Sequence, residues 1–244
     1  MAVFLYPKTE GLYVSIYYQD DYVTLYHGDA LEVAAWLQSD VLVTDPPYGI
    51  DYTGFGGLKG DPSRDRGRHK IVGDNSPAVR NAALNLWGSK PALVFGKWTI
   101  PYPQGTLQRI IWDKRPCGYM GNLNIPWATV EEEIYVLGEW PPLKPGGRLR
   151  EGGTPARHPN IINVPTLNSQ AANRPEHPTP KPLELMEQLI ERTPQGTIAD
   201  PFAGSGSTLV AARNLGRKAI GVELEEKYCE IIANRLSQGA FDFA

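Results

Sequence analysis

Residues 200–208 read Asp-Pro-Phe-Ala-Gly-Ser-Gly-Ser-Thr, and this glycine-rich stretch between a predicted strand and a predicted helix is the strongest local signal in the sequence. The apolar residues 198–199 before it predict a strand, and residues 205–215 after it have the pattern of a helix that ends at Gly216. Gly204 and Gly206 allow a ligand to approach the backbone, and the free N–H groups of the following helix suit a carboxylate or a phosphate. Because glycine also serves tight turns for purely structural reasons, the interpretation depends on what surrounds the turn.

The next strand along the chain strengthens the case for a ligand site. Residues 219–222 predict a strand, and Glu223 follows it, 23 residues after Asp200. Nucleotide-binding folds place an acid at this point to accept hydrogen bonds from ribose hydroxyls. A solvated acid at the start of the last helix is the alternative, which the glycine turn makes less attractive.

The rest of the chain alternates short apolar runs with helical patterns, which predicts an α/β fold with a central, mostly parallel sheet and helices on both faces. The further expected strands are residues 23–26, 41–44, 92–95, 108–112 and 129–137, and the further expected helices are residues 31–37, 77–87, 182–192 and 225–236. A chain of 244 residues with this pattern predicts a single domain over residues 1–244.

Composition excludes several classes of protein. Hydrophobic residues make up 41% and charged residues 21% of the chain, with a mean hydropathy of -0.33, so a disordered, fibrous or membrane-spanning protein is not expected. The two cysteines, Cys117 and Cys229, have no metal-ligand spacing, so we expect neither a disulfide framework nor a metal site. We expect a cytoplasmic protein, because the thiols suit a reducing compartment and the N-terminus lacks a secretory pattern.

A second motif, Asp-Pro-Pro-Tyr at residues 45–48, directly follows the expected strand at residues 41–44. Ligands bind at the carboxyl ends of strands in open α/β sheets, so an acid there is placed for function. The Asp45 carboxylate and the Pro46 carbonyl offer two acceptors to an amine, and Tyr48 offers a flat face for stacking. A proline turn capped by an aspartate is the structural alternative.

Two long segments, residues 49–75 and 143–176, are rich in Gly, Pro, Arg and Asn and are expected to be functional loops or disordered. Although the whole chain carries a net charge of -3, residues 54–70 and 143–176 each carry a net charge of +3. We expect the first segment to be a mobile loop beside the catalytic motif and the second to be an insertion that recognises the target. Ordinary solvated arginines on long loops are the alternative.

Together these motifs resemble the amino-directed DNA methyltransferases that use S-adenosylmethionine, in the β group, whose catalytic motif precedes the cofactor motif. The Asp-Pro-Pro-Tyr motif lies at residues 45–48, Phe-x-Gly-x-Gly at residues 202–206, His-x-Thr-x-Lys-Pro at residues 177–182, and a further Gly-Asp element at residues 28–29. The resemblance runs in the family's order from about residue 22 to residue 236 and implies the Rossmann-like methyltransferase fold.

The resemblance also implies roles for individual residues. The expected catalytic residues are Asp45, Pro46, Pro47 and Tyr48. Asp29 is expected at the adenine end of the cofactor and Glu223 at its ribose, and the full set expected to bind the cofactor is Asp29, Thr179, Lys181, Asp200, Phe202, Gly204, Gly206, Ser207, Thr208 and Glu223. The residues expected to contact DNA are Arg64, Arg66 and Arg68 at phosphates, and Arg148, Arg150, Arg157 and Asn160 at base edges.

The implied activity is methylation of an exocyclic amine in double-stranded DNA, with a flipped target base. Adenine N6 is favoured over cytosine N4, because the catalytic motif of the family begins more often with Asp for adenine and with Ser for cytosine. Related motifs also occur in methyltransferases of RNA bases and of protein glutamine. The sequence indicates no membrane partner and leaves a homodimer and a restriction endonuclease partner open.

Three other functions would share part of this pattern. A dehydrogenase would also have a glycine turn and a ribose acid, but it leaves residues 45–48 and 177–182 unexplained. A DNA-binding module without activity is disfavoured because both motifs are intact. The pair Pro116-Cys117 suggests the nucleophile of cytosine-C5 methyltransferases, but no Glu-Asn-Val partner follows it.

Overall fold

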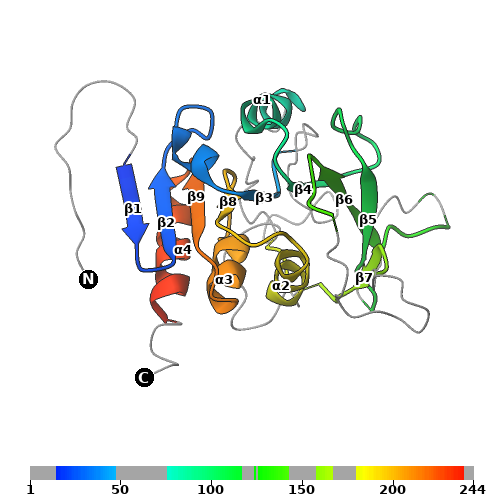
Figure 1. Ribbon diagram of the computed structural model, residues 1–244. Coiled ribbons are helices and arrows are strands. Elements are labelled where there is room, and N and C mark those ends of the chain that lie inside the picture. The colour runs from blue at the N-terminus through cyan, green and yellow to red at the C-terminus, as the bar shows by residue number, and fades with distance from the viewer. Residues whose placement is uncertain are drawn as a thin grey trace.

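The computed structural model describes residues 15–47, 76–116, 124, 126–142, 158–166 and 180–238. Their strands form one nine-stranded sheet in the order β1-β2-β9-β8-β3-β4-β6-β5-β7 (Figure 1). The strands are β1 (Ser15–Gln19), β2 (Val23–His27), β3 (Val41–Thr44), β4 (Ala92–Gly96), β5 (Gln108–Asp113), β6 (Glu131–Leu137), β7 (Ile161–Asn163), β8 (Ile198–Asp200) and β9 (Ala219–Glu223).

The sheet is mixed and mostly parallel, as expected. The neighbours β2·β9, β9·β8, β8·β3, β3·β4 and β5·β7 pair in parallel, whereas β1·β2, β4·β6 and β6·β5 are antiparallel. The antiparallel β6 lies between the parallel pair β3·β4 and β5. The start of β6 therefore lies at the same edge of the sheet as the carboxyl ends of β3, β4 and β5.

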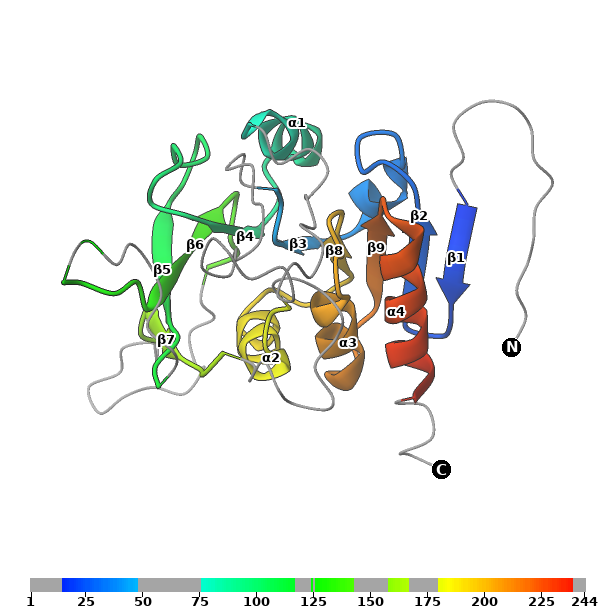
Figure 2. The same cartoon turned by 180° about the vertical axis from the view of Figure 1, so that it is seen from behind.

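Helices cover both faces of the sheet, which also confirms the prediction (Figures 1 and 2). The helices are the 3-10 helix η1 (Ala34–Gln38), α1 (Ala78–Trp87), α2 (Leu183–Glu191), α3 (Ser207–Asn214) and α4 (Glu226–Gln238). Apolar residues of α2, α3 and α4 pack on one face, and those of η1 and α1 pack on the other. Within the described residues, no helix combines the length and apolar character that a membrane crossing requires.

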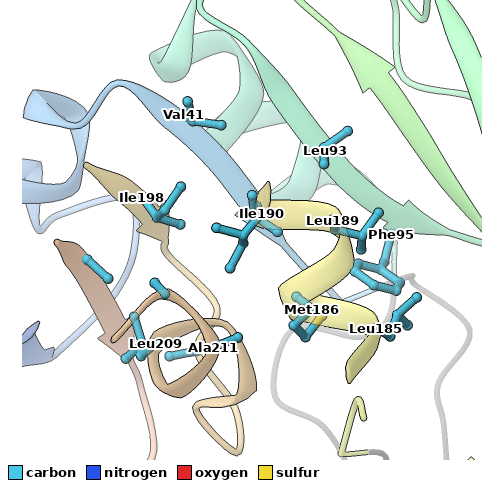
Figure 3. Close-up of a cluster of buried hydrophobic side chains, with 14 of the residues drawn as sticks. Val41, Leu93, Phe95, Leu185, Met186, Leu189, Ile190, Ile198, Leu209 and Ala211 are labelled. Atoms are coloured by element: carbon cyan, nitrogen blue, oxygen red, sulfur yellow. The ribbon is translucent and has the colours of Figure 1, made fainter. Parts of the chain in front are cut away.

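The larger core lies between the sheet and the helices α2, α3 and α4. Figure 3 shows Val41, Leu93, Phe95 and Ile198 of the strands facing Leu189 and other side chains of α2 and α3. Leu93 and Phe95 occupy alternate positions of β4, and Val41 and Val43 alternate positions of β3, so one face of these strands enters this core. Burial of these side chains holds α2 against the middle of the sheet.

Two predicted helices differ from the structure at their starts. The expected helix over residues 31–37 is wrong, because Val33 is extended and only the 3-10 turn of η1 forms. Val33 is 1% exposed, and in the extended conformation its side chain reaches the core. The helix expected from residue 205 begins at Ser207, because Gly206 has a φ of 76° and cannot belong to a right-handed helix.

Two strands of the structure were not expected. β1 is an edge strand near the N-terminus, and β7 lies inside the segment at residues 143–176 that was expected to be a loop. β7 pairs in parallel with β5, and the Asn160 side chain donates a hydrogen bond to the backbone carbonyl of Arg109 at 3.2 Å. This part of the segment, residues 158–166, therefore extends the sheet. The loop expected at residues 49–75 lies outside the described residues.

Candidate active site

The two motifs meet at the centre of the sheet. β3 and β8 are parallel neighbours, so Asp45, which follows β3, and Asp200, which ends β8, lie at the same edge. The Thr44 hydroxyl donates a hydrogen bond to Asp200 Oδ1 at 2.7 Å. The chain runs from β3 to β4 on one side and from β8 to β9 on the other, so this is the topological switch point where α/β sheets bind ligands.

Asp200 is a buried hydrogen-bond acceptor at the start of the glycine turn. It is 2% exposed, and its Oδ1 also accepts a hydrogen bond from the Phe202 N–H at 3.2 Å. Burial raises the pKa of Asp200 to about 6, although hydrogen bonds from Thr208, Thr44 and Phe202 favour the ionised form. Asp200 therefore holds the turn and the start of α3 to the end of β3.

Glu223 ends β9 and closes the turn from the other side. Its Oε2 accepts a hydrogen bond from the Gly204 N–H at 2.7 Å, and its Oε1 accepts one from the Glu225 N–H at 2.8 Å. Burial raises the pKa of Glu223 to about 7, because the hydrogen bonds from backbone N–H groups offset only part of the desolvation. The geometry leaves a nearly buried carboxylate beside the glycine turn.

Asp29 lies at the end of the neighbouring strand β2. The Gly28 N–H donates a hydrogen bond to the Glu223 carbonyl at 3.0 Å, which holds the segment after β2 beside the end of β9. The exposed Asp29 side chain accepts a hydrogen bond from the Leu31 N–H at 2.8 Å. The structure thus brings Asp29, Glu223 and the glycine turn to one edge of the sheet.

Lys181, just before α2, joins the two motifs. Its backbone carbonyl accepts a hydrogen bond from the Ser207 hydroxyl at 2.8 Å, at the start of α3. Its ammonium group lies 2.6 Å from Asp45 Oδ2. The resemblance implies a place for Lys181 near the methionine moiety of a cofactor, whereas its charge in this structure is paired with Asp45 of the Asp-Pro-Pro-Tyr motif.

Two charged residues that were not expected at the site complete this edge. Glu132 of β6 lies 2.9 Å from the Lys181 ammonium and 2.9 Å from that of Lys114. Burial disfavours the ionised form of Glu132, but the ammonium groups of Lys181 and Lys114 outweigh burial and hold the pKa of Glu132 well below its usual range. A usable signal was present, because acidic residues are depleted in strands and Glu131–Glu133 are three in succession inside a predicted strand.

Several expected site residues lie outside the described residues. These are Tyr48 of the catalytic motif, Thr179 of the cofactor set, and the basic residues Arg64, Arg66, Arg68, Arg148, Arg150 and Arg157. The described members of the expected catalytic and cofactor sets converge on one edge of the sheet through the strand ends and turns to which they belong. Asn160, which was expected at base edges, lies instead beside Arg109 near the start of β5, away from this edge. Phe202 packs its half-buried ring against the core on the α1 face.

Comparisons with known proteins agree with this geometry. The family model described as DNA methylase, N6_N4_Mtase, matches residues 79–234. The type II methyltransferase M.ScaI of Streptomyces caespitosus is 28% identical over 257 residues, which cover 92% of this chain and 84% of M.ScaI. The crystal structure of the M1.HpyAVI–SAM complex has a TM-score of 0.54 at 22% identity, covering 87% of this chain and 99% of that one. The PvuII DNA methyltransferase, described as cytosine-N4-specific, has a TM-score of 0.57 at 16% identity, covering 91% of this chain and 89% of that one.

The fold and the site define a methyltransferase that uses S-adenosylmethionine. More particularly, the chain belongs to the N6-adenine/N4-cytosine DNA methylase family, whose model matches more than half of it. Its substrate is accordingly DNA. The described residues suit the cofactor, because the Glu223 carboxylate provides acceptors for hydroxyl groups next to a turn built on glycine.

Proposed function

We propose that this protein methylates adenine N6 at specific sites in double-stranded DNA and belongs to the β group of the family. The observation that carries the proposal is the position of Asp45 at the end of β3, next to the glycine turn that follows β8. The choice of adenine rests on the first residue of the catalytic motif, which is Asp here and more often Ser in cytosine enzymes. The proposal of the β group is supported by the order of the motifs, with residues 45–48 before residues 202–206.

In the proposed mechanism, Asp45 and the Pro46 carbonyl accept hydrogen bonds from the exocyclic amine of the flipped base. These bonds favour a pyramidal nitrogen and aim its lone pair, so that positioning and electrostatics supply the catalysis without a covalent enzyme intermediate. The cofactor, when bound, supplies an electrophilic methyl group on its sulfonium. An ionised carboxylate has about four acceptor sites, so the Lys181 ammonium does not exhaust the acceptor capacity of Asp45. Tyr48 is proposed to stack on the base.

One experiment tests the choice of base and the class of substrate. The protein is incubated with isotopically labelled cofactor and bacterial genomic DNA from a methylation-deficient host, and the DNA is digested to nucleosides. We expect the label in N6-methyl-2′-deoxyadenosine. Label in N4-methylcytosine would replace adenine by cytosine in the proposal, and transfer to RNA or to protein glutamine in parallel incubations, with none to DNA, would overturn it.

The proposed ribose contact makes a prediction about pH. Because ribose hydroxyls donate to an ionised carboxylate, protonation of Glu223 as the pH falls through about 7 should weaken cofactor binding. Binding is thus strongest above this pH and weakens below it, until the contribution of the ionised carboxylate, about 1–3 kcal/mol, is lost. Glu223→Gln should flatten the pH dependence, and Glu223→Ala should weaken binding by about 1–3 kcal/mol. Calorimetric titrations with the cofactor at pH values above and below the Glu223 pKa measure both effects. If the cofactor affinity of Glu223→Gln depends on pH in the same way as that of the unaltered protein, Glu223 does not bind the ribose.

The proposed phosphate contacts make a prediction about salt. Replacement of Arg64, Arg66 and Arg68 by alanine should weaken binding to all DNA sequences alike and reduce the salt slope by about 0.9 for each phosphate that is no longer neutralised. Fluorescence anisotropy with duplex DNA over a range of salt concentrations measures the slope. Cofactor affinity serves as the control and should not change. An unchanged slope would leave these arginines as ordinary solvated side chains.

A further inference from the structure

Four neighbouring strands place one residue each in a row along the candidate active site. Lys114 follows β5, Glu132 is the second residue of β6, Phe95 is in β4 and Asp45 follows β3. The pairing registers set Glu132 opposite Trp112 of β5, and Ile134, two residues after Glu132, opposite Phe95. Alternate residues of a strand share a face. The four side chains therefore lie on the face that carries α2, because Trp112, Ile134, Phe95 and Val43 all belong to the core on that face.

The ammonium of Lys181 lies over the middle of this row. It is 4.8 Å from the centre of the Phe95 ring, 2.6 Å from Asp45 and 2.9 Å from Glu132. Glu132 uses its other oxygen, Oε2, for Lys114 at 2.9 Å. The result is a line of alternating charges that ends on the proposed catalytic carboxylate, in the order Lys114, Glu132, Lys181, Asp45.

Burial makes this arrangement costly for a purely structural role. The side chains of Lys181 and Glu132 are only 8% and 14% exposed. Buried ion pairs lose much of their Coulomb gain to desolvation, and apolar residues of the same size often stabilise a fold as well or better. The two attached carboxylates nevertheless raise the pKa of Lys181 against the effect of burial, so the ammonium stays charged. Because the buried ammonium of Lys181 is kept charged at this cost in desolvation, we infer that it serves a function at the Asp45 carboxylate.

Lysine alone is a poor positioning group, because its compact ammonium sits on a flexible stem of four carbons. In this structure the backbone of Lys181 is held by Ser207, and its ammonium is held from two sides by Asp45 and Glu132. Without Glu132, the Lys181 ammonium would lose its partner on the side away from Asp45. The ammonium and the Asp45 carboxylate that it contacts would then be freer to move. Glu132 thus fixes the point from which Lys181 orients Asp45.

We propose that Glu132 is a positioning residue for methyl transfer, which acts through Lys181 on the orientation of the Asp45 carboxylate. This inference rests on the proposed catalytic role of Asp45. A misplacement of about 1 Å can cost up to about a hundredfold in rate. Loss of Glu132 should therefore slow the chemical step while leaving the binding of cofactor and DNA intact.

The test compares Glu132→Gln with Glu131→Gln. The control removes the same charge from the neighbouring residue of β6, whose side chain points to the opposite face. Single-turnover methylation of unmethylated genomic DNA, at saturating cofactor and DNA, isolates the chemical step from binding. We expect Glu132→Gln to lower this rate about ten- to a hundredfold. The dissociation constants of this variant for cofactor and for DNA should stay within about twofold of those of the unaltered protein. Glu131→Gln should keep the original rate.

Two further variants separate positioning from loss of structure. Glu132→Asp keeps the charge and should recover part of the rate lost in Glu132→Gln. In a Lys181→Met background, Glu132→Gln should cause no further loss, because Glu132 acts through the ammonium. Equal rates for Glu132→Gln and Glu131→Gln, or a full additional loss in the Lys181→Met background, would overturn the inference. Asp45→Ala, which removes the acceptor, is assayed in parallel: if it is inactive while Glu132→Gln is fully active, the inference alone fails, and if it is fully active, the proposed function fails.

Discussion

Asp45→Ala is expected to lower the rate of methyl transfer by about 10²–10³-fold, the usual effect of removing one group that stabilises a developing charge. The reason is that Asp45 lies at the carboxyl end of the central strand β3, where its carboxylate is proposed to accept hydrogen bonds from the target amine. Single-turnover methylation of genomic DNA measures the rate, and calorimetry measures cofactor binding. Cofactor affinity should change little, because Glu223 and the glycine turn belong to β9, β8 and α3.

The structure also predicts a cost in stability for this variant. Asp45 accepts a hydrogen bond from the buried Lys181 ammonium, so its removal should lower the free energy of unfolding by about 1–3 kcal/mol. Glu132 continues to pair with Lys181, which keeps the loss below that of an isolated buried charge. Asp45→Asn is the matched control for volume, and because its amide oxygen still accepts a hydrogen bond, it should lose less of the rate than Asp45→Ala. A variant that binds cofactor, melts normally and retains most of its activity would exclude Asp45 from catalysis.

Gly206→Ala is expected to have the second large effect, on both stability and cofactor binding. Gly206 has a φ of 76°, and a Cβ there would lie 2.8 Å from Cγ1 of Ile232 in α4. The left-handed conformation costs an L residue about 1–2 kcal/mol, and the collision with a packed core adds about 1–3 kcal/mol. Relief of the collision would move the start of α3, so the affinity for S-adenosylmethionine should fall as well. The glycine is thus required by the packing of α4, whereas the sequence suggested only close approach of a ligand.

Gly216→Ala provides the matched control for backbone strain. Gly216 follows the other end of α3 with a φ of 66°, and nothing lies within 4 Å of the position of an added Cβ. Gly216→Ala should therefore lower the free energy of unfolding only by the cost of placing an L residue in the left-handed conformation, about 1–2 kcal/mol. Its affinity for the cofactor should not change. Thermal unfolding and calorimetry measure both variants. Equal destabilisation by the two substitutions would show that the collision with Ile232 contributes nothing.

Much of the fold followed from local pattern. The runs that became β3, β4 and β9 are short and apolar, and the helical patterns that became α1, α2 and α4 are amphipathic and bounded by turns. The predictions failed where neighbours in space overruled local preference. Val33 takes an extended conformation that ends any helix before η1, and β7 is a strand because it pairs with the outer edge of β5.

The class of fold and the two motifs could be predicted from local sequence, because a strand end, a glycine turn and a run of prolines are encoded by adjacent residues. Which charges meet depends on the packing of distant segments. Lys181 and Asp45 are 136 residues apart in the chain, and Glu132 comes from a third element between them. Their contact depends on the strand order that places β3, β4, β6 and β5 side by side and on the packing of α2 over Phe95. Such an order is set by the burial of apolar faces across the whole sheet, which no local stretch of sequence contains.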